Sequence, residues 1–259
     1  MNNILEIKNL HKKYHTVDGE VDAIKNISFD VYKGEFVAIV GSSGCGKSTL
    51  LSILAELDEK TSGDIKLADN TKIGYMLQQD ALFPWATVFN NAILGLDITN
   101  DKSYSNIAYV DKLLKTYGLG DFINKFPNQL SGGMRQRCAL IRTLATKPDI
   151  LLLDEPYSAL DYQTRLAVSD DVYRIIKQEG KTVIMVTHDL AEAISMADTI
   201  IVLSKRPATI KKTYKINLSN RGFPIQNRKA KEFSEYYDMI WRDLDVNISW
   251  ARKIFTKYC

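Results

Sequence analysis

The stretch Gly41–Thr49, with the sequence GSSGCGKST, constrains the fold of this chain more than any other feature. It fits the pattern GxxxxGK[ST], in which glycines let the backbone wrap around an anion with its N–H groups pointing inward. An apolar run, Phe36–Val40, precedes it and is typical of a strand buried on both faces. Helical periodicity follows over Ser48–Leu57. The strand–turn–helix order predicts a phosphate-binding loop at a helix N-terminus and disfavours a simple glycine-rich turn.

The residue types in this loop indicate a nucleotide triphosphate with Mg²⁺. Lys47 can reach the β- and γ-phosphates, and the Ser48 hydroxyl can ligate the metal. The residues that we expect to bind the nucleotide are Gly41, Ser42, Ser43, Gly44, Cys45, Gly46, Lys47, Ser48 and Thr49.

Two carboxylates follow a second buried apolar run, Ile150–Leu153. Ligands bind at such strand ends in open α/β sheets. Asp154 suits Mg²⁺ through water, because this ion keeps much of its hydration shell. Glu155 points elsewhere and can polarise an attacking water. The alternative is a solvated acidic turn before Pro156, which the phosphate loop makes the weaker interpretation.

His188 follows a third β-rich run, Val183–Val186, and precedes the acidic start of a helix at Asp189. A histidine here can converge on the same terminal phosphate. A helix-capping or packed histidine is the alternative that the sequence leaves open.

Strand and helix patterns alternate along the chain. Ile4–Tyr14 and Ile27–Val31 read as strands, as does Ile73–Leu77. Strand signals vanish between residues 85 and 145, where helical patterns dominate. We therefore predict an α/β core with a helical subdomain inserted into it. From Lys205 onward the chain is more basic and less regular, and it becomes helical again around residues 229–243.

The composition limits the function classes. With 34 Lys+Arg against 31 Asp+Glu, the net charge of +3 is too small to indicate nucleic acid. The three cysteines, Cys45, Cys138 and Cys259, form no CxxC pair, which favours a reducing compartment. No secretory signal is evident, and the apolar runs are too short to cross a bilayer. A role at a membrane would therefore need a partner protein.

A second candidate anion-binding motif, LSGGMRQR, occurs in the helical insert. Ser131 can cap a helix containing residues 135–144 while exposed N–H groups face an anion. An ordinary helix cap without a ligand is the alternative. The motif lies roughly ninety residues beyond the phosphate loop, on the insert, so the sequence contains two separate motifs suited to anions.

The motifs GSSGCGKST, Gln78, LSGGM, LLLDEP, SALD and THD, in this order, closely resemble the ATP-binding subunits of ABC transporters. The resemblance runs from about Ile4 to Leu203. It implies the P-loop fold of the ABC ATPases, an α/β core with an N-terminal antiparallel β subdomain. It also implies ATP and Mg²⁺ as cofactors. The implied domains are an ATPase domain over residues 1–205, with the helical subdomain at about 85–145, and a C-terminal extension over residues 206–259 packed on it.

The resemblance also implies residue roles. Tyr14 would stack on adenine, and Glu155 would be the catalytic glutamate. Gln78 would contact both the metal and the attacking water, and His188 would be the switch histidine. The implied metal ligands are Ser48, Gln78 and Asp154.

In a head-to-tail dimer of such subunits, each ATP lies between the phosphate loop of one copy and the signature motif of the other. The residues that would act across this dimer are Ser131, Gly132, Gly133, Met134 and Asp161.

Finer features are similar to the nitrate, sulfonate and taurine branch of importers. These are the segment Gln78–Trp85, Met134 within the signature, and Leu203–Pro207 after the core. The glycine that usually follows this proline is replaced by Ala208. The branch implies uptake of a small solute of this kind, or of a vitamin precursor. The subunit would lie on the cytoplasmic face of the membrane, bound to permease proteins through Gln78–Trp85 and indirectly served by a solute-binding protein.

Other classes of protein remain as alternatives. A soluble ABC-type ATPase of DNA repair would carry long heptads between residues 85 and 130, and a translation factor would carry two cassettes. An exporter or lipoprotein-release subunit fits less well with the Phe83–Trp85 cluster, and a P-loop kinase would not need the signature. Phe83 and Trp85 either pack within the insert or form a groove for a permease helix.

Overall fold

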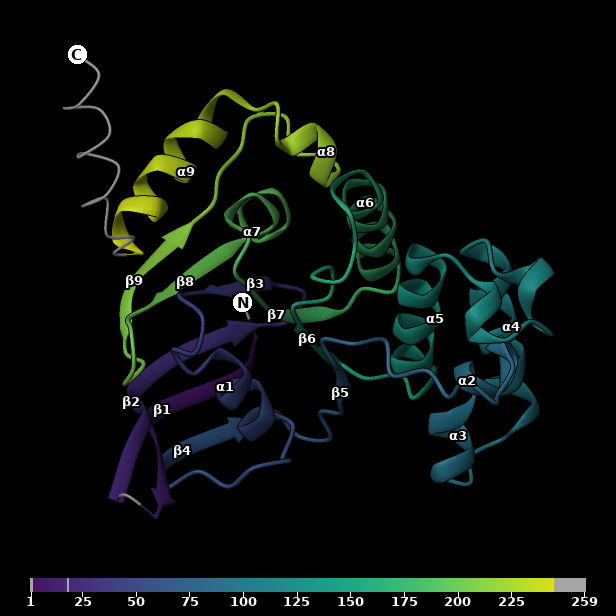
Figure 1. Ribbon diagram of the computed structural model, residues 1–259, viewed down its shortest axis with the longest axis horizontal. Coiled ribbons are helices and arrows are strands. Elements are labelled where there is room, and N and C mark those ends of the chain that lie inside the picture. The colour runs from purple at the N-terminus through teal and green to yellow at the C-terminus, as the bar shows by residue number, and fades with distance from the viewer. Residues whose placement is uncertain (1, 18, 245–259) are drawn as a thin grey trace.

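The computed structural model describes residues 2–17 and 19–244 of the chain. Its larger sheet contains six strands (Figure 1), in the order β5 (Ile73–Met76), β6 (Ile150–Asp154), β7 (Thr182–Thr187), β3 (Phe36–Val40), β8 (Thr199–Leu203) and β9 (Ile210–Lys215). The first five are parallel, and β9 is antiparallel to β8. Every residue of β3, β6, β7 and β8 is buried, because both faces of the sheet are covered.

The two faces of β3 pack into different hydrophobic clusters. Phe36, Ala38 and Val40 belong to one cluster, whereas Val37 and Ile39 belong to the other. This split follows from the alternation of side chains along a strand. The apolar run before the phosphate loop is therefore the centre of the molecule.

A second, antiparallel sheet packs against the helix that follows the phosphate loop. Its order is β2 (Gly19–Tyr32), β1 (Asn3–Thr16) and β4 (Ser62–Leu67). The helix α1 (Lys47–Leu54) shares a hydrophobic cluster with this sheet and with one face of β3. Figure 1 shows α1 between the two sheets.

Helices cover the other face of the larger sheet. They are α6 (Tyr162–Gln178), α7 (Leu190–Met196), α8 (Pro224–Asn227) and α9 (Lys231–Asp243). The fully buried Ile240 of α9 joins the same cluster as Ile194 of α7 and Val40 of β3. The C-terminal helix is therefore packed onto the core as far as the described residues reach.

The segment between β5 and β6 is helical and lies to one side of the sheets in Figure 1. It contains α2 (Val88–Ala92), α3 (Leu94–Ile98), α4 (Tyr104–Thr116), the short 3₁₀ helices Gly120–Phe122 and Pro127–Gln129, and α5 (Gly132–Ala145). The predicted helical character of residues 85–145 agrees with these elements. The predicted core and N-terminal antiparallel sheet are present as well.

Three strands were not predicted from the sequence: β4, β8 and β9. The sequence of β9, IKKTYK, carries a weak signal because only Tyr214 is buried in it. Since β9 pairs with β8, the expected boundary at residue 205 falls between two paired strands. The division into domains stays a prediction, and the part of the expected extension beyond residue 244 lies outside the described residues.

Candidate nucleotide-binding site

The phosphate loop connects the carboxyl end of β3 to α1. The backbone of Gly44 has φ 72° and that of Gly46 has φ 122°, both in the left-handed region that favours glycine. A Cβ atom on Gly46 would lie 2.9 Å from the carbonyl oxygen of Ala23. Glycine is therefore required at this position both for backbone conformation and for space.

Lys47 is the first residue of α1, and its side chain turns back over the loop. Its Nζ donates hydrogen bonds to the carbonyl oxygens of Gly41 at 3.0 Å and Ser42 at 3.1 Å. Only 5% of the residue is exposed. The ammonium is thus held at the loop that the sequence predicts to bind phosphates, where it would meet an anion.

Asp154, at the end of β6, faces the start of α1. The Ser48 hydroxyl donates to its Oδ1 at 3.1 Å, and the Tyr75 hydroxyl donates to its Oδ2 at 3.2 Å. Burial raises the pKa of Asp154 above its ordinary value, although these two hydrogen bonds oppose the change. Burial, followed by the negative charge of Asp154, raises the pKa of Tyr75 to about 12.

The donor set around Asp154 suits Mg²⁺. Ser48 and Asp154 offer only oxygen atoms, which this ion prefers, and their side chains already meet. Within residues 2–17 and 19–244, no group of three or more His, Cys, Asp or Glu side chains could hold a metal. A site of few protein oxygens fits an ion that takes its remaining ligands from phosphates and water.

Glu155 lies one residue beyond β6 and contacts two other predicted site residues. Its Oε2 is 3.1 Å from Nδ1 of His188 and accepts a hydrogen bond of 3.4 Å from Nε2 of Gln78. Its backbone has φ 45°, an unfavourable conformation for a residue with a Cβ atom. Its N–H donates to the carbonyl oxygen of Val186 in β7 at 2.9 Å, which holds it there. Such strained residues concentrate at functional sites.

The phosphate loop, Glu155 and His188 line one cavity of about 640 Å³. The ends of β3, β6 and β7 bring these groups together, as expected for parallel strands. The C-terminal helix also reaches this cavity, through residues that the sequence did not single out. The full lining is Gly41, Ser42, Ser43, Glu155, His188, Asp189, Leu190, Tyr237, Trp241 and Leu244.

Tyr14, near the end of β1, is 38% exposed. Its hydroxyl donates to Oδ2 of Asp58 at 2.7 Å, and the Lys12 ammonium lies 4.6 Å from its ring centroid. Burial, then the hydrogen bond to Asp58, raises the pKa of Tyr14, and a contact with Thr49 opposes this. The ring is therefore beside the end of the phosphate loop, and its role towards adenine stays a prediction.

The signature residues form a second group, none of which lines the cavity just described. Ser131 caps α5 and accepts a hydrogen bond of 3.3 Å from the N–H of Met134, as the sequence predicts. Asp161 caps α6, accepting from the N–H groups of its first turn. The helix cap is thus confirmed, and a role across a dimer stays a prediction.

The glycines of the signature are in tight contact with the region around Asp161. A Cβ atom on Gly132 would lie 2.8 Å from Cδ2 of Leu160, and one on Gly133 would lie 2.6 Å from Cγ2 of Val168. Both glycines are therefore needed for close packing against the loop and helix that follow Glu155.

Phe83 and Trp85 do not pack into the core of the helical segment. Their rings stack on each other, with centroids 4.9 Å apart and planes 15° apart. Phe83 is 39% exposed and Trp85 is 73% exposed. Packing within the insert is therefore not observed for these two rings, and a groove for a permease helix stays a prediction.

Sequence reasoning missed several residues of the site. Tyr75 lies in the predicted strand Ile73–Leu77, but only the pairing of β5 with β6 brings it to Asp154. Ser158, whose Oγ accepts from Nε2 of Gln78 at 3.5 Å, lies in the SALD motif. Tyr237 and Trp241 had no signal, since only tertiary packing brings α9 to the cavity.

Comparisons with known proteins agree with the family that the sequence resembles. A family model described as "ABC transporter" matches residues 24–158. The taurine import ATP-binding protein TauB of Ruegeria pomeroyi is 37% identical over 258 residues, covering 94% of this chain and 96% of that protein. The nitrate import ATP-binding protein NrtD of Synechocystis sp. is 39% identical over 248 residues, covering 91% and 93%. A dimeric ATP-binding cassette in a post-hydrolysis state with ADP and Pi superimposes with a TM-score of 0.70 at 34% identity, covering 83% of this chain and 99% of that one.

Proposed function

The chain belongs to the ABC transporter family, and from this premise we propose that it is the ATP-hydrolysing subunit of an importer for a small solute. One observation carries the proposal. The phosphate loop, Glu155 and His188 line a single cavity, while the Ser48–Asp154 pair lies beside the loop at the start of α1. A nucleotide bound in the loop would have its terminal phosphate directed toward the acid and the histidine.

Each residue has a role that its position supports. The loop's N–H groups and Lys47 would bind the phosphates, and Ser48, Asp154 and Gln78 would hold Mg²⁺. When bound, Mg²⁺ would neutralise charge on the phosphate oxygens.

Glu155 would orient the attacking water and accept its proton. The ring of His188 lies at 3.1 Å from this carboxylate, so it would steady both the acid and the γ-phosphate. Gln78, which follows β5, donates a hydrogen bond to the same carboxylate. The three side chains would therefore act on one water molecule.

Two copies would share their ATP sites in a head-to-tail dimer. Ser131 to Met134 and Asp161 lie outside the cavity that contains their own chain's phosphate loop. A similar solved cassette is dimeric. In such a dimer, the capped N-terminus of α5 would complete the site of the other copy, and closure on ATP would move the permease.

The partner and location follow from the surface and the relatives. Similar proteins are named for the import of taurine and of nitrate, so a small anionic or zwitterionic organic solute or nitrate is the proposed class, with a vitamin precursor as the broader possibility. No helix within residues 2–17 and 19–244 is long and apolar enough to span a membrane. The exposed Phe83–Trp85 stack would receive a cytoplasmic helix of the permease, placing the subunit at the membrane's inner face.

The hydrolytic role is tested with Glu155→Gln, which keeps the size of the side chain and removes its charge. We expect the affinity for ATP to stay within about three-fold and phosphate release to fall at least a hundred-fold, because electrostatic and general-base terms of this kind contribute about 10²–10⁴ in rate. Glu6→Gln, at a surface carboxylate of β1 that pairs with Lys8 and does not line the cavity, is the matched control. Normal phosphate release from Glu155→Gln would refute the assignment.

A further inference from the structure

We propose that Arg165 is a positioning residue that couples the two ATP sites of the dimer. It would do so by joining the segment that carries His188 to the loop and signature that face the second copy. The inference rests on the proposed function, because it requires the shared sites of a dimer. It concerns a cluster of four side chains, Arg165, Thr187, Asp189 and Glu192, called the linking cluster below.

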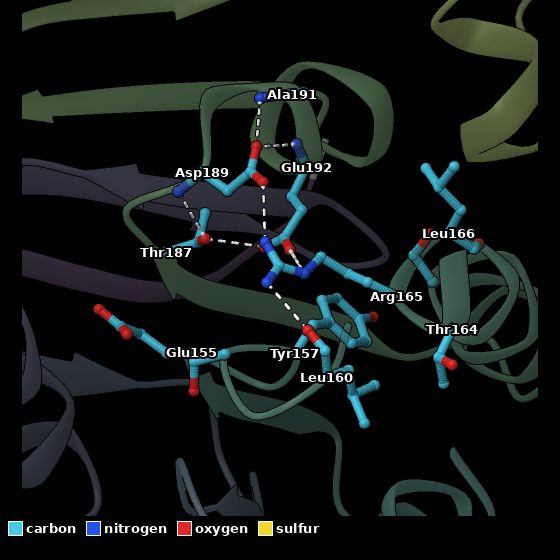
Figure 2. A network of polar contacts seen from close by, with 12 residues as sticks. Glu155, Tyr157, Leu160, Thr164, Arg165, Leu166, Thr187, Asp189, Ala191 and Glu192 are labelled. Atoms are coloured by element: carbon cyan, nitrogen blue, oxygen red, sulfur yellow. Dashed lines mark hydrogen bonds and ion pairs between the residues drawn. The ribbon is translucent and has the colours of Figure 1, made fainter. Parts of the chain in front are cut away.

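Arg165 lies in the first turn of α6 and contacts two other segments (Figure 2). Its Nη1 donates to Oδ2 of Asp189 at 3.3 Å, and its Nη2 donates to the carbonyl oxygen of Leu160 at 3.1 Å. Its Nε is 3.8 Å from Oε1 of Glu192. A single guanidinium therefore holds the loop before α6 and the start of α7 at the same time. Its planar, multiply donating head is suited to such a bridge.

On the α7 side, the contacts lead directly to His188. Asp189 accepts from the N–H groups of Ala191 and Glu192, and its own N–H donates to the Thr187 hydroxyl at 3.0 Å. The Thr187 hydroxyl donates to Oε2 of Glu192 at 2.8 Å. His188 lies between Thr187 and Asp189, so both of its neighbours are fixed by the linking cluster.

On the α6 side, the contacts lead to the residues that would face the second copy. Leu160, held by Arg165, precedes Asp161 and lies where a Cβ atom of Gly132 would touch it. Val168, one turn beyond Arg165 on α6, is the closest neighbour of Gly133. The loop that Arg165 holds and the helix that carries it therefore pack against the signature glycines of the same chain.

The two ends of this connection serve different ATP molecules in the proposed dimer. His188 lines the cavity of its own chain's phosphate loop. The signature residues and Asp161 lie outside that cavity and would complete the site of the other copy. A displacement of α6 or its loop on contact with the second copy would therefore be transmitted through Arg165 to His188.

The burial of Glu192 indicates that the linking cluster does more than stabilise the fold. Glu192 is 3% exposed, and a buried ion pair often contributes no more to stability than well-packed apolar side chains would. The directional hydrogen bonds of the arginine instead fix one relative position of α6 and α7. A fixed position is what a catalytic histidine at the end of β7 requires.

The test uses mixed dimers of full-length chains that carry two different affinity tags and are purified through both. The reference dimer pairs a wild-type chain with a Glu155→Gln chain, so only the site at the wild-type phosphate loop hydrolyses. Arg165→Gln is then introduced either into the wild-type chain or into the Glu155→Gln chain. Single-turnover hydrolysis of bound ATP and ATP affinity are measured for each.

We expect both arrangements to hydrolyse at least ten-fold more slowly than the reference, with ATP affinity unchanged within two-fold. Arg165→Lys, which keeps the charge, should recover part of the rate in both. Should Arg165→Gln fail to fold, Arg165→Lys takes its place, with an expected slowing of at least three-fold. Arg174→Gln is the matched control, since Arg174 is exposed on the same helix and contacts Phe223 rather than the linking cluster.

Slowing in only one arrangement would show that Arg165 acts within one site, and slowing in neither would show that it has no role; both results overturn the coupling. An equal loss with Arg174→Gln would also overturn it. A reference dimer that does not form or does not hydrolyse ATP would count against the proposed function itself. A working reference with unaffected Arg165 variants would count only against the coupling.

Discussion

Replacing Glu192 by glutamine should make the protein's stability less dependent on pH. Burial, followed by the charge of Asp189, raises the pKa of Glu192 from 4.5 to about 7, whereas the Thr187 hydroxyl, Arg165 and Arg228 oppose this. The buried ring of Tyr157 also faces this carboxyl group. Because the pKa is higher in the folded state, the stability associated with Glu192 is complete below about pH 4.5 and is lost as the pH rises through about 7.

The pKa change corresponds to about 3 kcal/mol, at ~1.4 kcal/mol for each pKa unit. Glutamine at this position mimics the protonated acid at every pH. We therefore expect the two proteins to have similar free energies of unfolding at pH 5, and the variant to be more stable by about 2–3 kcal/mol at pH 8.

Urea unfolding of both proteins at pH 5, 6, 7 and 8 measures this difference. Subtracting the two curves removes the titration of groups that they share. Glu6→Gln is the control, because the hydrogen bond from Lys8 lowers the pKa of this surface carboxylate below 4.5, and its difference from wild type should stay constant across this range. A constant difference for Glu192→Gln as well would refute the raised pKa and its cause.

Three further predictions follow from individual contacts. Lys47→Ala should weaken ATP binding at least ten-fold in a titration with fluorescent nucleotide, because it removes the buried ammonium at the loop, and unchanged affinity would contradict its role. Gly133→Ala should destabilise the chain by about 1–3 kcal/mol through its contact with Val168, and a double variant with Val168→Ala should lose less than the sum of the two losses. Trp85→Ala should leave the ATPase rate of the isolated chain within two-fold yet reduce its sedimentation with permease-containing membranes; equal sedimentation would speak against this docking surface.

The family and the fold class predicted from the sequence are confirmed. Local patterns were sufficient for β3, β6 and β7, because a strand buried on both faces reads as an uninterrupted apolar run. The phosphate loop and the caps at Ser131 and Asp189 also depend on nearby residues alone. They could therefore be predicted without knowledge of the tertiary structure.

Other features could not be predicted because they depend on distant segments. The strand β9 has a single buried residue and exists because β8 offers it an edge. Trp241 reaches the cavity only through the packing of α9, and Arg165 meets Glu192 only once α6 and α7 lie together. The roles of the site residues stay predictions for the experiments proposed above.

The central claim is that two copies share their ATP sites, and the Glu155→Gln variant tests it most directly. Light scattering during size-exclusion chromatography, with and without ATP and Mg²⁺, gives the mass of the purified variant. The variant should elute as a monomer of 29.3 kDa without nucleotide and as a dimer with ATP, and a further Ser131→Arg change at the cap of α5 should abolish the dimer. A monomer in the presence of saturating ATP, or a dimer that Ser131→Arg leaves intact, would contradict the shared site.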